Sequence, residues 1–335
     1  MNRITKLFLV LLGIGADVIT VTSGTVGTAG NVAGDLQTYF ALKLLEVAEF
    51  TTILDQFGEK EPLPANSSKT IQFSREEKFA ASTSPSQLTE GLAPDATGIS
   101  LNEFQAVVEQ YGFLVRISDL AILTAKHPIV EKTIKLLGIN AAETYDILIF
   151  NVLNAGTTVY RPNARAADVN LLATDTIGYT DLVQNEAALN VLGGRPFADG
   201  DYVCVMAPQV HAALLRDPDF KAANQLGKPE RIWKGEVQEL GGVRIVRTNS
   251  PAFAAVTQTP SGATNKVYSS FMIAQFAYQI TDLQHLQVIV TAPGGGFDPL
   301  KQSYKVGYKF SFKSLITNQN WLTVMKSSGQ DSVNN

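Results

Sequence analysis

The sequence predicts an α+β fold, and three features carry this prediction. Residues 128–154 repeat apolar side chains at helical spacing, and residues 304–312 alternate between two faces as a strand does. No strand-helix-strand unit repeats along the chain, so a parallel, doubly wound sheet is not expected. The remaining elements expected along the chain fit this class.

The composition indicates a substantial core and no general attraction to nucleic acid. Hydrophobic residues make up 45% and charged residues 17% of 335 residues, which fits two domains or one elaborate domain. The 27 basic and 31 acidic residues leave a net charge of −4. Because Cys204 is the single cysteine, an intramolecular disulfide and a Cys-rich zinc site are excluded, and folding in a reducing cytoplasm is expected.

The first 37 residues allow two interpretations. Arg3 and Lys6 precede an apolar run at residues 7–14, followed by Gly15 and Ala16, which is the layout of a secretory signal peptide. The run is too short to span a bilayer, and an apolar N-terminal arm that docks on a neighbouring surface explains it equally well. We take residues 1–37 as an arm, and the signal peptide remains the alternative.

A helix is expected next, followed by a long excursion. Apolar residues recur at spacings near three and four between residues 35 and 54, after Asp35 as a plausible N-cap. Residues 57–117 then leave the compact pattern. Ile71 and Phe73 alternate with polar residues, residues 80–98 lack periodicity, and residues 100–117 return as a strand with a bulge near Gly112.

Such a ribbon is marginal in water, because it buries too little apolar surface to offset the entropy of ordering it. Something outside the ribbon must therefore hold it. The simplest candidate is another copy of the same chain.

The longest periodic element begins at Pro128, after a short helical turn at residues 119–125, and ends before Gly156. It is a rod of roughly 40 Å. Its apolar stripe comprises Val130, Ile134, Leu137, Ala141, Tyr145, Leu148 and Val152.

The second half mixes short helices and strands. Helices are expected from Thr180, as N-cap, to Leu192 and over residues 208–216. Strands are expected at residues 202–207, 267–273, 286–291 and 304–312, with a hairpin over residues 236–248. After a turn at residues 317–320, residues 321–325 are expected to pair back onto the strand at 304–312.

Lys305, Lys309 and Lys313, which we call the lysine row, occupy the face of the last long strand opposite its aromatic residues. The row could meet nucleic acid, acidic residues of a neighbour, or solvent. The neighbour and the solvent rank first, because the aromatic residues lie on the other face and cannot form a stacking platform beside the lysines.

The sequence carries no catalytic signature. The three histidines, His127, His211 and His285, are isolated in sequence, and Cys204 lies inside an apolar strand. The glycines at 294–296 are not followed by the residues of a phosphate loop, and the carboxylates at 76–77 and at 217 and 219 are expected to be solvated. We expect no catalytic, cofactor-binding or metal site.

Several segments resemble the major capsid proteins of N4-like tailed phages, over about residues 38–324 and most specifically in the first half. They are Phe40-Ala41-Leu42-Lys43-Leu44-Leu45, Asp55-Gln56-Phe57-Gly58-Glu59-Lys60-Glu61-Pro62-Leu63-Pro64, Lys69-Thr70-Ile71-Gln72-Phe73, Leu88-Thr89-Glu90-Gly91, Glu109-Gln110-Tyr111-Gly112, Ser118-Asp119-Leu120 and Leu153-Asn154-Ala155-Gly156.

The resemblance implies the HK97-type capsid fold. The implied parts are an N-terminal helix at 38–57, an extended β-hairpin E-loop at 58–112, a peripheral domain at 113–179 with a spine helix at 128–154, an axial domain at 180–299, and a peripheral return with a C-terminal tail at 300–335. The fold lays the E-loop of one subunit across the peripheral domain of the next. The residues singled out are Ile71, Phe73, Leu88, Glu90, Gly91 and Phe104 as intersubunit contacts of the E-loop, Ile134, Leu137, Tyr145 and Leu148 in the spine helix, and the lysine row in the C-terminal strand.

The implied function is structural. Pentamers and hexamers would form an icosahedral virion shell around double-stranded DNA, without sequence-specific binding, with a portal protein at one vertex and possible scaffolding and decoration proteins. Assembly in the cytoplasm of a bacterial host, and no membrane partner, are expected. The alternatives are an encapsulin-like compartment shell and an exported enzyme or binding protein with a signal peptide.

Overall fold

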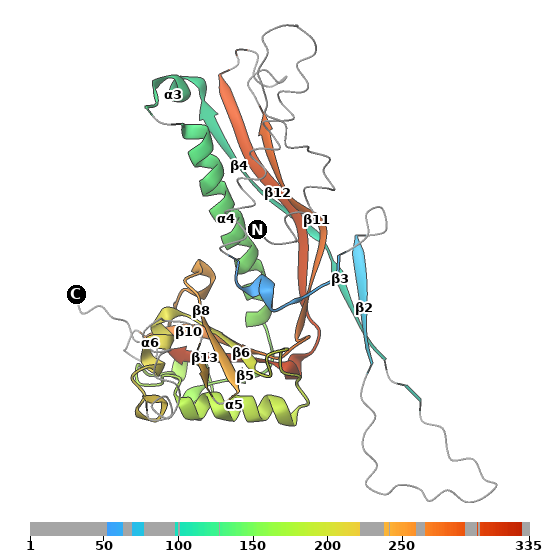
Figure 1. Ribbon diagram of the computed structural model, residues 1–335, viewed down its shortest axis with the longest axis vertical. Coiled ribbons are helices and arrows are strands. Elements are labelled where there is room, and N and C mark those ends of the chain that lie inside the picture. Colours follow the sequence, from blue (N-terminus) through green and yellow to red (C-terminus); the bar gives the residue numbers. More distant parts are fainter. Residues whose placement is uncertain are drawn as a thin grey trace, which may run out of the picture.

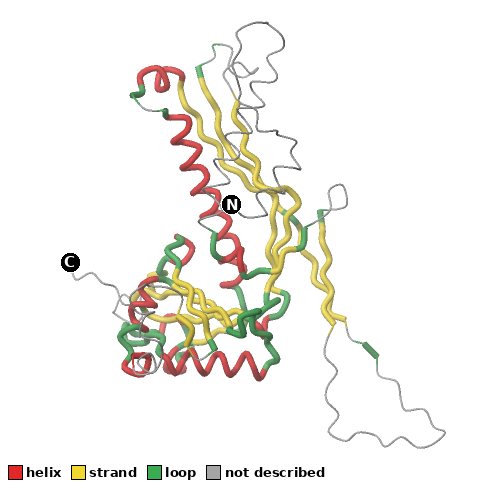
Figure 2. The backbone as a smooth tube through the Cα atoms, viewed as in Figure 1, coloured by secondary structure: helices red, strands yellow, loops and turns green. Residues whose placement is uncertain are grey.

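The computed structural model describes residues 52–62, 69–76, 98–99, 101–126, 128–221, 238–240, 242–258, 265–291, 300 and 302–329. These residues form a four-stranded sheet beside a long helix, a seven-stranded sheet with shorter helices below it, and a two-stranded ribbon at the side (Figures 1 and 2). The expected N-terminal arm, and the helix expected at 38–57 except its last residues, lie outside the described residues.

The four-stranded sheet has the order β1-β11-β12-β4. Its strands are β1 (Glu59–Lys60), β11 (Tyr278–Thr291), β12 (Ser303–Ile316) and β4 (Glu109–Ser118). β12 is antiparallel to both of its neighbours, and its pairing with β4 runs unbroken from Ser303↔Ser118 to Phe312↔Glu109. The strand predicted at 286–291 is confirmed but is longer and begins earlier, at Tyr278.

The bulge expected near Gly112 is wrong, because the β4–β12 register passes through Gly112 without a shift. The glycine serves a close approach instead: a Cβ at Gly112 would lie 2.7 Å from the carbonyl oxygen of Tyr308. The predicted strand at 100–117 is interrupted at Val108, which separates β3 (Leu101–Val107) from β4.

The predicted long helix is confirmed as α4 (Ile129–Asn154), with Pro128 at its N-cap position. It lies along one face of the four-stranded sheet (Figure 1). The short turn before it is α3 (Asp119–Thr124), capped by the Ser118 Oγ, which accepts from the Ala121 N–H at 3.2 Å. By length and composition α4 is the one helix among the described residues that could cross a membrane, but one of its faces packs on protein.

The seven-stranded sheet has the order β5-β13-β10-β6-β8-β7, with β9 also paired to β10. Its strands are β5 (Val159–Tyr160), β13 (Leu322–Ser328), β10 (Asn265–Ile273), β6 (Tyr202–Met206), β8 (Val243–Arg247), β7 (Gln238–Leu240) and β9 (Val256–Gln258). The helices beside it are α5 (Tyr179–Val191) and α6 (Pro208–Leu214). Short 3-10 turns occupy Leu54–Gln56, Pro162–Ala164, Asp168–Asn170, Pro251–Phe253 and Gln319–Trp321.

The pairing expected for residues 321–325 is wrong. β13 does not return to β12, but pairs antiparallel with β10 and parallel with β5 in the other sheet. The reason is that both edges of β12 are already occupied by β11 and β4. β13 is buried on both faces along nearly its whole length, which a strand on a half-exposed sheet would not be.

Two crossings side by side connect the sheets, at residues 274–277 and 317–321, and we call this pair the neck. The N–H of Ala274 donates to the Trp321 carbonyl at 3.0 Å, and the N–H groups of Thr317 and Asn318 donate to the Ala277 carbonyl at 3.0 and 3.2 Å. Because of these crossings β11 lies in the four-stranded sheet and β13 in the seven-stranded sheet.

The close pairing of β4 and β12 gives a first testable prediction. A Cβ at Gly307 would lie 2.7 Å from the Phe113 carbonyl oxygen and 3.0 Å from the Leu114 Cδ1. We therefore expect Gly307→Ala to lower the free energy of unfolding by about 2 kcal/mol, measured by urea denaturation. Gly98→Ala is the control, since nothing lies within 4 Å of its Cβ position. Equal effects of the two changes would contradict the close approach.

Candidate assembly surfaces

The base of the ribbon is a small core of its own. β2 (Thr70–Glu76) pairs antiparallel with β3, which places Ile71 opposite Ala106 and Phe73 opposite Phe104. Ile71 is 8% and Phe73 5% exposed, and the cluster packs on Leu315 of β12. These two side chains are thus covered by their own chain. Whether they also support contacts between subunits stays a prediction.

A polar contact fixes the same base. The Arg75 Nη1 donates to the Thr317 carbonyl at 3.0 Å, and its guanidinium lies 5.8 Å from the ring centre of Phe104. The ribbon is therefore tied to the end of β12, beside the neck. The implied contact residues Leu88, Glu90 and Gly91 lie outside the described residues.

The predicted apolar stripe of the long helix faces the four-stranded sheet. Ile134 and Leu137 are buried, while Tyr145 and Leu148 are half-buried against the main core. The Tyr145 ring lies with its centre 4.3 Å from that of Phe312. The stripe thus holds the helix on its own sheet. Another set of α4 side chains, Leu136, Ile139 and Ile147, is exposed.

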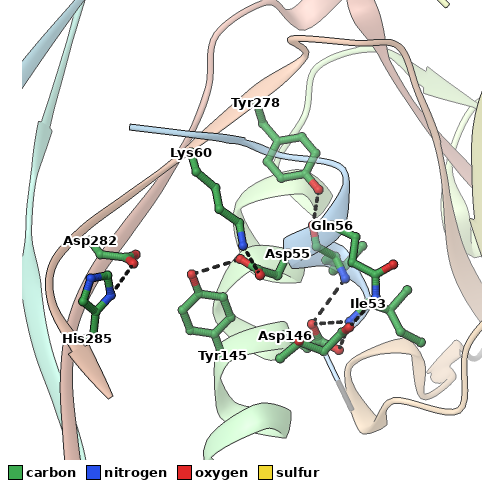
Figure 3. Close-up of polar contacts among 11 residues, drawn as sticks. Ile53, Asp55, Gln56, Lys60, Tyr145, Asp146, Tyr278, Asp282 and His285 are labelled. Carbon is green, nitrogen blue, oxygen red and sulfur yellow. Dashed lines mark hydrogen bonds and ion pairs between the residues drawn. The ribbon is translucent and has the colours of Figure 1, made fainter. Parts of the chain in front are cut away.

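The segment before the ribbon is clamped between α4 and β11 (Figure 3). The buried Asp146 carboxylate accepts from the N–H of Ile53 at 3.2 Å and of Leu54 at 3.4 Å. The Tyr278 hydroxyl donates to the Leu54 carbonyl, and the Tyr145 hydroxyl donates to Asp55 Oδ1 at 3.3 Å. These bonds satisfy backbone groups where the chain enters the core.

Burial raises the pKa of Asp146 to about 6, although the two backbone N–H groups oppose the shift. A carboxyl with a raised pKa binds more protons in the folded than in the unfolded chain. Its ionisation therefore destabilises the fold above pH 6, and stability returns as the pH falls from 6 towards 4.

Asp146→Asn tests this titration. The free energy of unfolding of the unaltered chain, relative to the variant, is expected to rise by up to about 3 kcal/mol as the pH falls from 7 to 4. Urea denaturation at several pH values measures the difference. Asp199→Asn is the control for replacing a carboxylate by an amide, because the Asp199 side chain is exposed. If the difference in the free energy of unfolding between the unaltered chain and Asp146→Asn does not change with pH, the titration of Asp146 is ruled out.

A cleft of about 480 Å³ opens beside this clamp, between α4 and the sheet. Apolar residues such as Phe310 and Ala141 line it together with Asp55, Lys60 and Asp282. His285 lies at its rim, 86% exposed, with Nδ1 3.1 Å from Asp282 Oδ2. Burial raises the pKa of Asp282, with Asp55 adding to the effect and His285 and Lys60 opposing it. No group of three metal-ligating side chains gathers within the described part of the chain.

The lysine row lies on the sheet face away from α4. Lys313 pairs with Glu109 at 3.5 Å. Lys305 stands directly opposite Arg116 of β4, and Lys309 stands opposite Gly112. Like charges directly opposite each other destabilise a strand pair, so this face favours an anionic neighbour or solvent.

Three further candidates have structural explanations. Cys204 is fully buried in β6, and burial raises the pKa of its thiol, so the thiol is unreactive. His211 is half-buried in α6, and burial lowers its pKa. The expectation that Asp217 is merely solvated is wrong: its Oδ2 accepts from the Tyr179 N–H at 2.6 Å and caps α5, where Thr180 was expected to be the N-cap.

The family model for phage capsid protein matches residues 102–313 of this chain. The chain belongs to the phage capsid protein family. The match begins in β3 and ends in β12, so it includes α4, three strands of the four-stranded sheet, and the seven-stranded sheet except β13. None of the curated proteins matches the capsid chain.

Solved shells have the same fold as this capsid protein. The capsid of cyanophage P-SCSP1u aligns over 95% of this chain and 94% of its own, at 15% identity and a TM-score of 0.60. The capsid of Ralstonia phage GP4 aligns over 85% and 93%, at 12% identity and a TM-score of 0.64. The capsid of Helicobacter pylori bacteriophage KHP30 aligns over 98% of both chains, at 11% identity and a TM-score of 0.59. The predicted HK97-type α+β capsid fold is confirmed.

Proposed function

We propose that the chain is the major capsid protein of an N4-like tailed phage, assembling as pentamers and hexamers into an icosahedral shell around double-stranded DNA. The family match over residues 102–313 carries the proposal, because it spans the long helix and sheet that form the body of the subunit. The finer assignment to N4-like phages rests on the sequence segments that resemble those proteins.

In this proposal the subunit acts mechanically and has no catalytic role. The ribbon reaches from its base towards the next subunit and serves as the E-loop, while α4 serves as the spine helix. The four-stranded sheet with α4 corresponds to the peripheral domain, and the seven-stranded sheet to the axial domain. Each contact is modest, and the shell gains its strength because every subunit has several neighbours.

The net charge of −4 suits a container for DNA, because a strongly basic chain would bind the genome along its whole length. A portal protein at one vertex, scaffolding or decoration proteins, and assembly in the cytoplasm of the host complete the proposal.

Electron microscopy of native particles, processed without imposed symmetry, tests the proposal. We expect closed shells of pentamers and hexamers that contain genome-length DNA. A stable monomer as the native form would overturn the proposal.

An encapsulin-like compartment is the second candidate, because the virus-like particle from Pyrococcus furiosus aligns over 87% of this chain, at 9% identity and a TM-score of 0.52. Enzyme cargo in place of DNA would favour that candidate.

A further inference from the structure

The outer edge of β4 is open. β4 is the last strand of the four-stranded sheet and pairs with β12 on one side, while no other described strand pairs with its second side. Two consecutive side chains near its centre, Phe113 and Leu114, are 52% and 63% exposed. Consecutive strand residues point to opposite faces, so one apolar side chain flanks this edge on each face, and Leu114 shares its face with Arg116 and the lysine row.

The backbone pattern shows which groups face the open edge. The Asp119 N–H donates to the Gln302 carbonyl at 2.9 Å, at the end of the β4–β12 ladder. Antiparallel partners alternate between bonded and non-bonded pairs, so the odd-numbered residues of β4 bond to β12. The N–H and C=O groups of Gly112, Leu114 and Arg116 therefore point outward, away from β12.

This edge lacks most of the devices by which soluble proteins protect open strands, namely lysine, proline, a bulge or a very short strand, and its two charged residues, Glu109 and Arg116, lie near its ends. β4 has 10 residues, contains neither lysine nor proline, and keeps a regular register with β12. A regular edge whose centre, from Gly112 to Val115, carries no charge is a template for another strand.

We propose that the outer edge of β4 takes an extended segment of a second copy of this chain, which extends the four-stranded sheet from one subunit into the next. The inference rests on the proposed function, because a shell brings copies of the same chain edge to edge. The outward groups suit a protein strand, because its backbone offers both N–H and C=O groups to pair with them, whereas a phosphate backbone offers only acceptors.

The size of the edge also fits a second copy. A single strand edge buries much less than the roughly 1,200 Å² of a stable pairwise interface, so free subunits stay apart. In a shell the same weak contact is repeated and held by the other contacts of each subunit.

Hydrogen exchange on the unaltered chain tests the backbone bonds. The N–H groups of Gly112, Leu114 and Arg116 are expected to exchange rapidly in free subunits and at least tenfold more slowly in shells. Rapid exchange in intact shells would overturn this inference and leave the proposed function standing. Slow exchange already in free subunits would also overturn it, because the edge would then be covered by its own chain. Failure of the unaltered chain to form shells would overturn both.

Substitution at one position separates the backbone from the side chain. Leu114→Pro removes an outward N–H without removing a bond to β12, whereas Leu114→Ala keeps the N–H and shortens the side chain. We expect the proline variant to lower the yield of shells at least tenfold relative to the alanine variant, with both folded by circular dichroism. Equal yields from the two folded variants would overturn the inference.

A crosslinking experiment tests the identity of the partner. The Leu114→Cys variant is labelled at its new thiol with a photoreactive maleimide while the subunits are free, and the labelled subunits are then assembled. Cys204 is fully buried, so the label goes to the new thiol. Illumination of shells is expected to give an adduct of two copies of the chain. An adduct with a different protein, or one confined to a single chain, would overturn the inference.

Discussion

Deletion of residues 80–98, joined by a short Gly-Ser linker, is expected to leave a folded subunit that no longer closes into shells. The base of the ribbon is held within its own chain by Ile71, Phe73 and the Arg75–Thr317 bond, so the deletion spares the core. The lost part is the one proposed to reach the next subunit. Circular dichroism and urea denaturation measure folding, and electron microscopy counts closed shells. We expect the yield of shells to fall by a factor of ten or more.

The matched control for this deletion lies at the base of the same ribbon. Phe73→Ala removes a buried ring that contacts the subunit's own β12 side, and we expect it to lower the free energy of unfolding by about 3 kcal/mol. Shells formed as efficiently with the deletion as without it would show that the ribbon is not the arm between subunits.

Phe271→Ala is expected to destabilise the subunit by about 4 kcal/mol, the largest loss we predict for a single side chain. Phe271 is fully buried at the centre of the seven-stranded sheet, and its ring packs edge to face on Phe150 of α4 and on Phe253, at centroid distances of 5.1 and 5.6 Å. Its removal leaves a cavity at the point where α4 meets this sheet. Thermal and urea denaturation measure the loss.

Phe113→Ala is the matched control for Phe271→Ala. The Phe113 ring is half-exposed on β4, so we expect less than about 1 kcal/mol of destabilisation. Similar losses for the two phenylalanines would mean that the ring cluster around Phe271 does not anchor α4.

The long helix could be predicted because several independent features of the sequence indicate it. Apolar side chains lie on the same face over several turns, and Pro128 and Gly156 mark the ends of the helix. The predicted bounds therefore differ from those of α4 by only one residue. The alternation of aromatic residues and lysines likewise predicted β12 and its core face, and the contact of Tyr145 with Phe312 shows that α4 packs on this face.

Strand partners were not predictable in the same way, because alternation gives the faces of a strand and not its neighbours. The error on β13 shows the limit: residues near in sequence were expected to pair, although two other strands already flanked β12. The apolar character of Leu322, Val324 and Met325 was the available signal, since a strand covered on both faces belongs in the middle of a buried sheet.

The candidate contact residues show a second limit. Alternation at Ile71 and Phe73 correctly marked a buried face, but a pattern cannot say which chain covers it, and Leu315 of the same subunit does so. The clamp at Asp146 was missed although a signal existed. Asp146 falls on the buried side of the helix, four residues after Ala142 and three before Ile149, where a lone carboxylate needs partners.

The neck determines how a subunit of this shape responds to load. Tension between the two sheets is shared by the two chains of the neck and by residues 155–158, which lead from α4 to β5, so stretching meets high resistance. Rotation of one sheet against the other shears the bonds at Ala277, next to Phe276, whose φ of 63° places it in the left-handed region, and disturbs the packing of Phe150 on Phe271. Rotation is therefore the easier of the two deformations, because it breaks only non-covalent contacts, and rotation is the freedom that one chain would need to sit at both flat and curved positions of a closed surface.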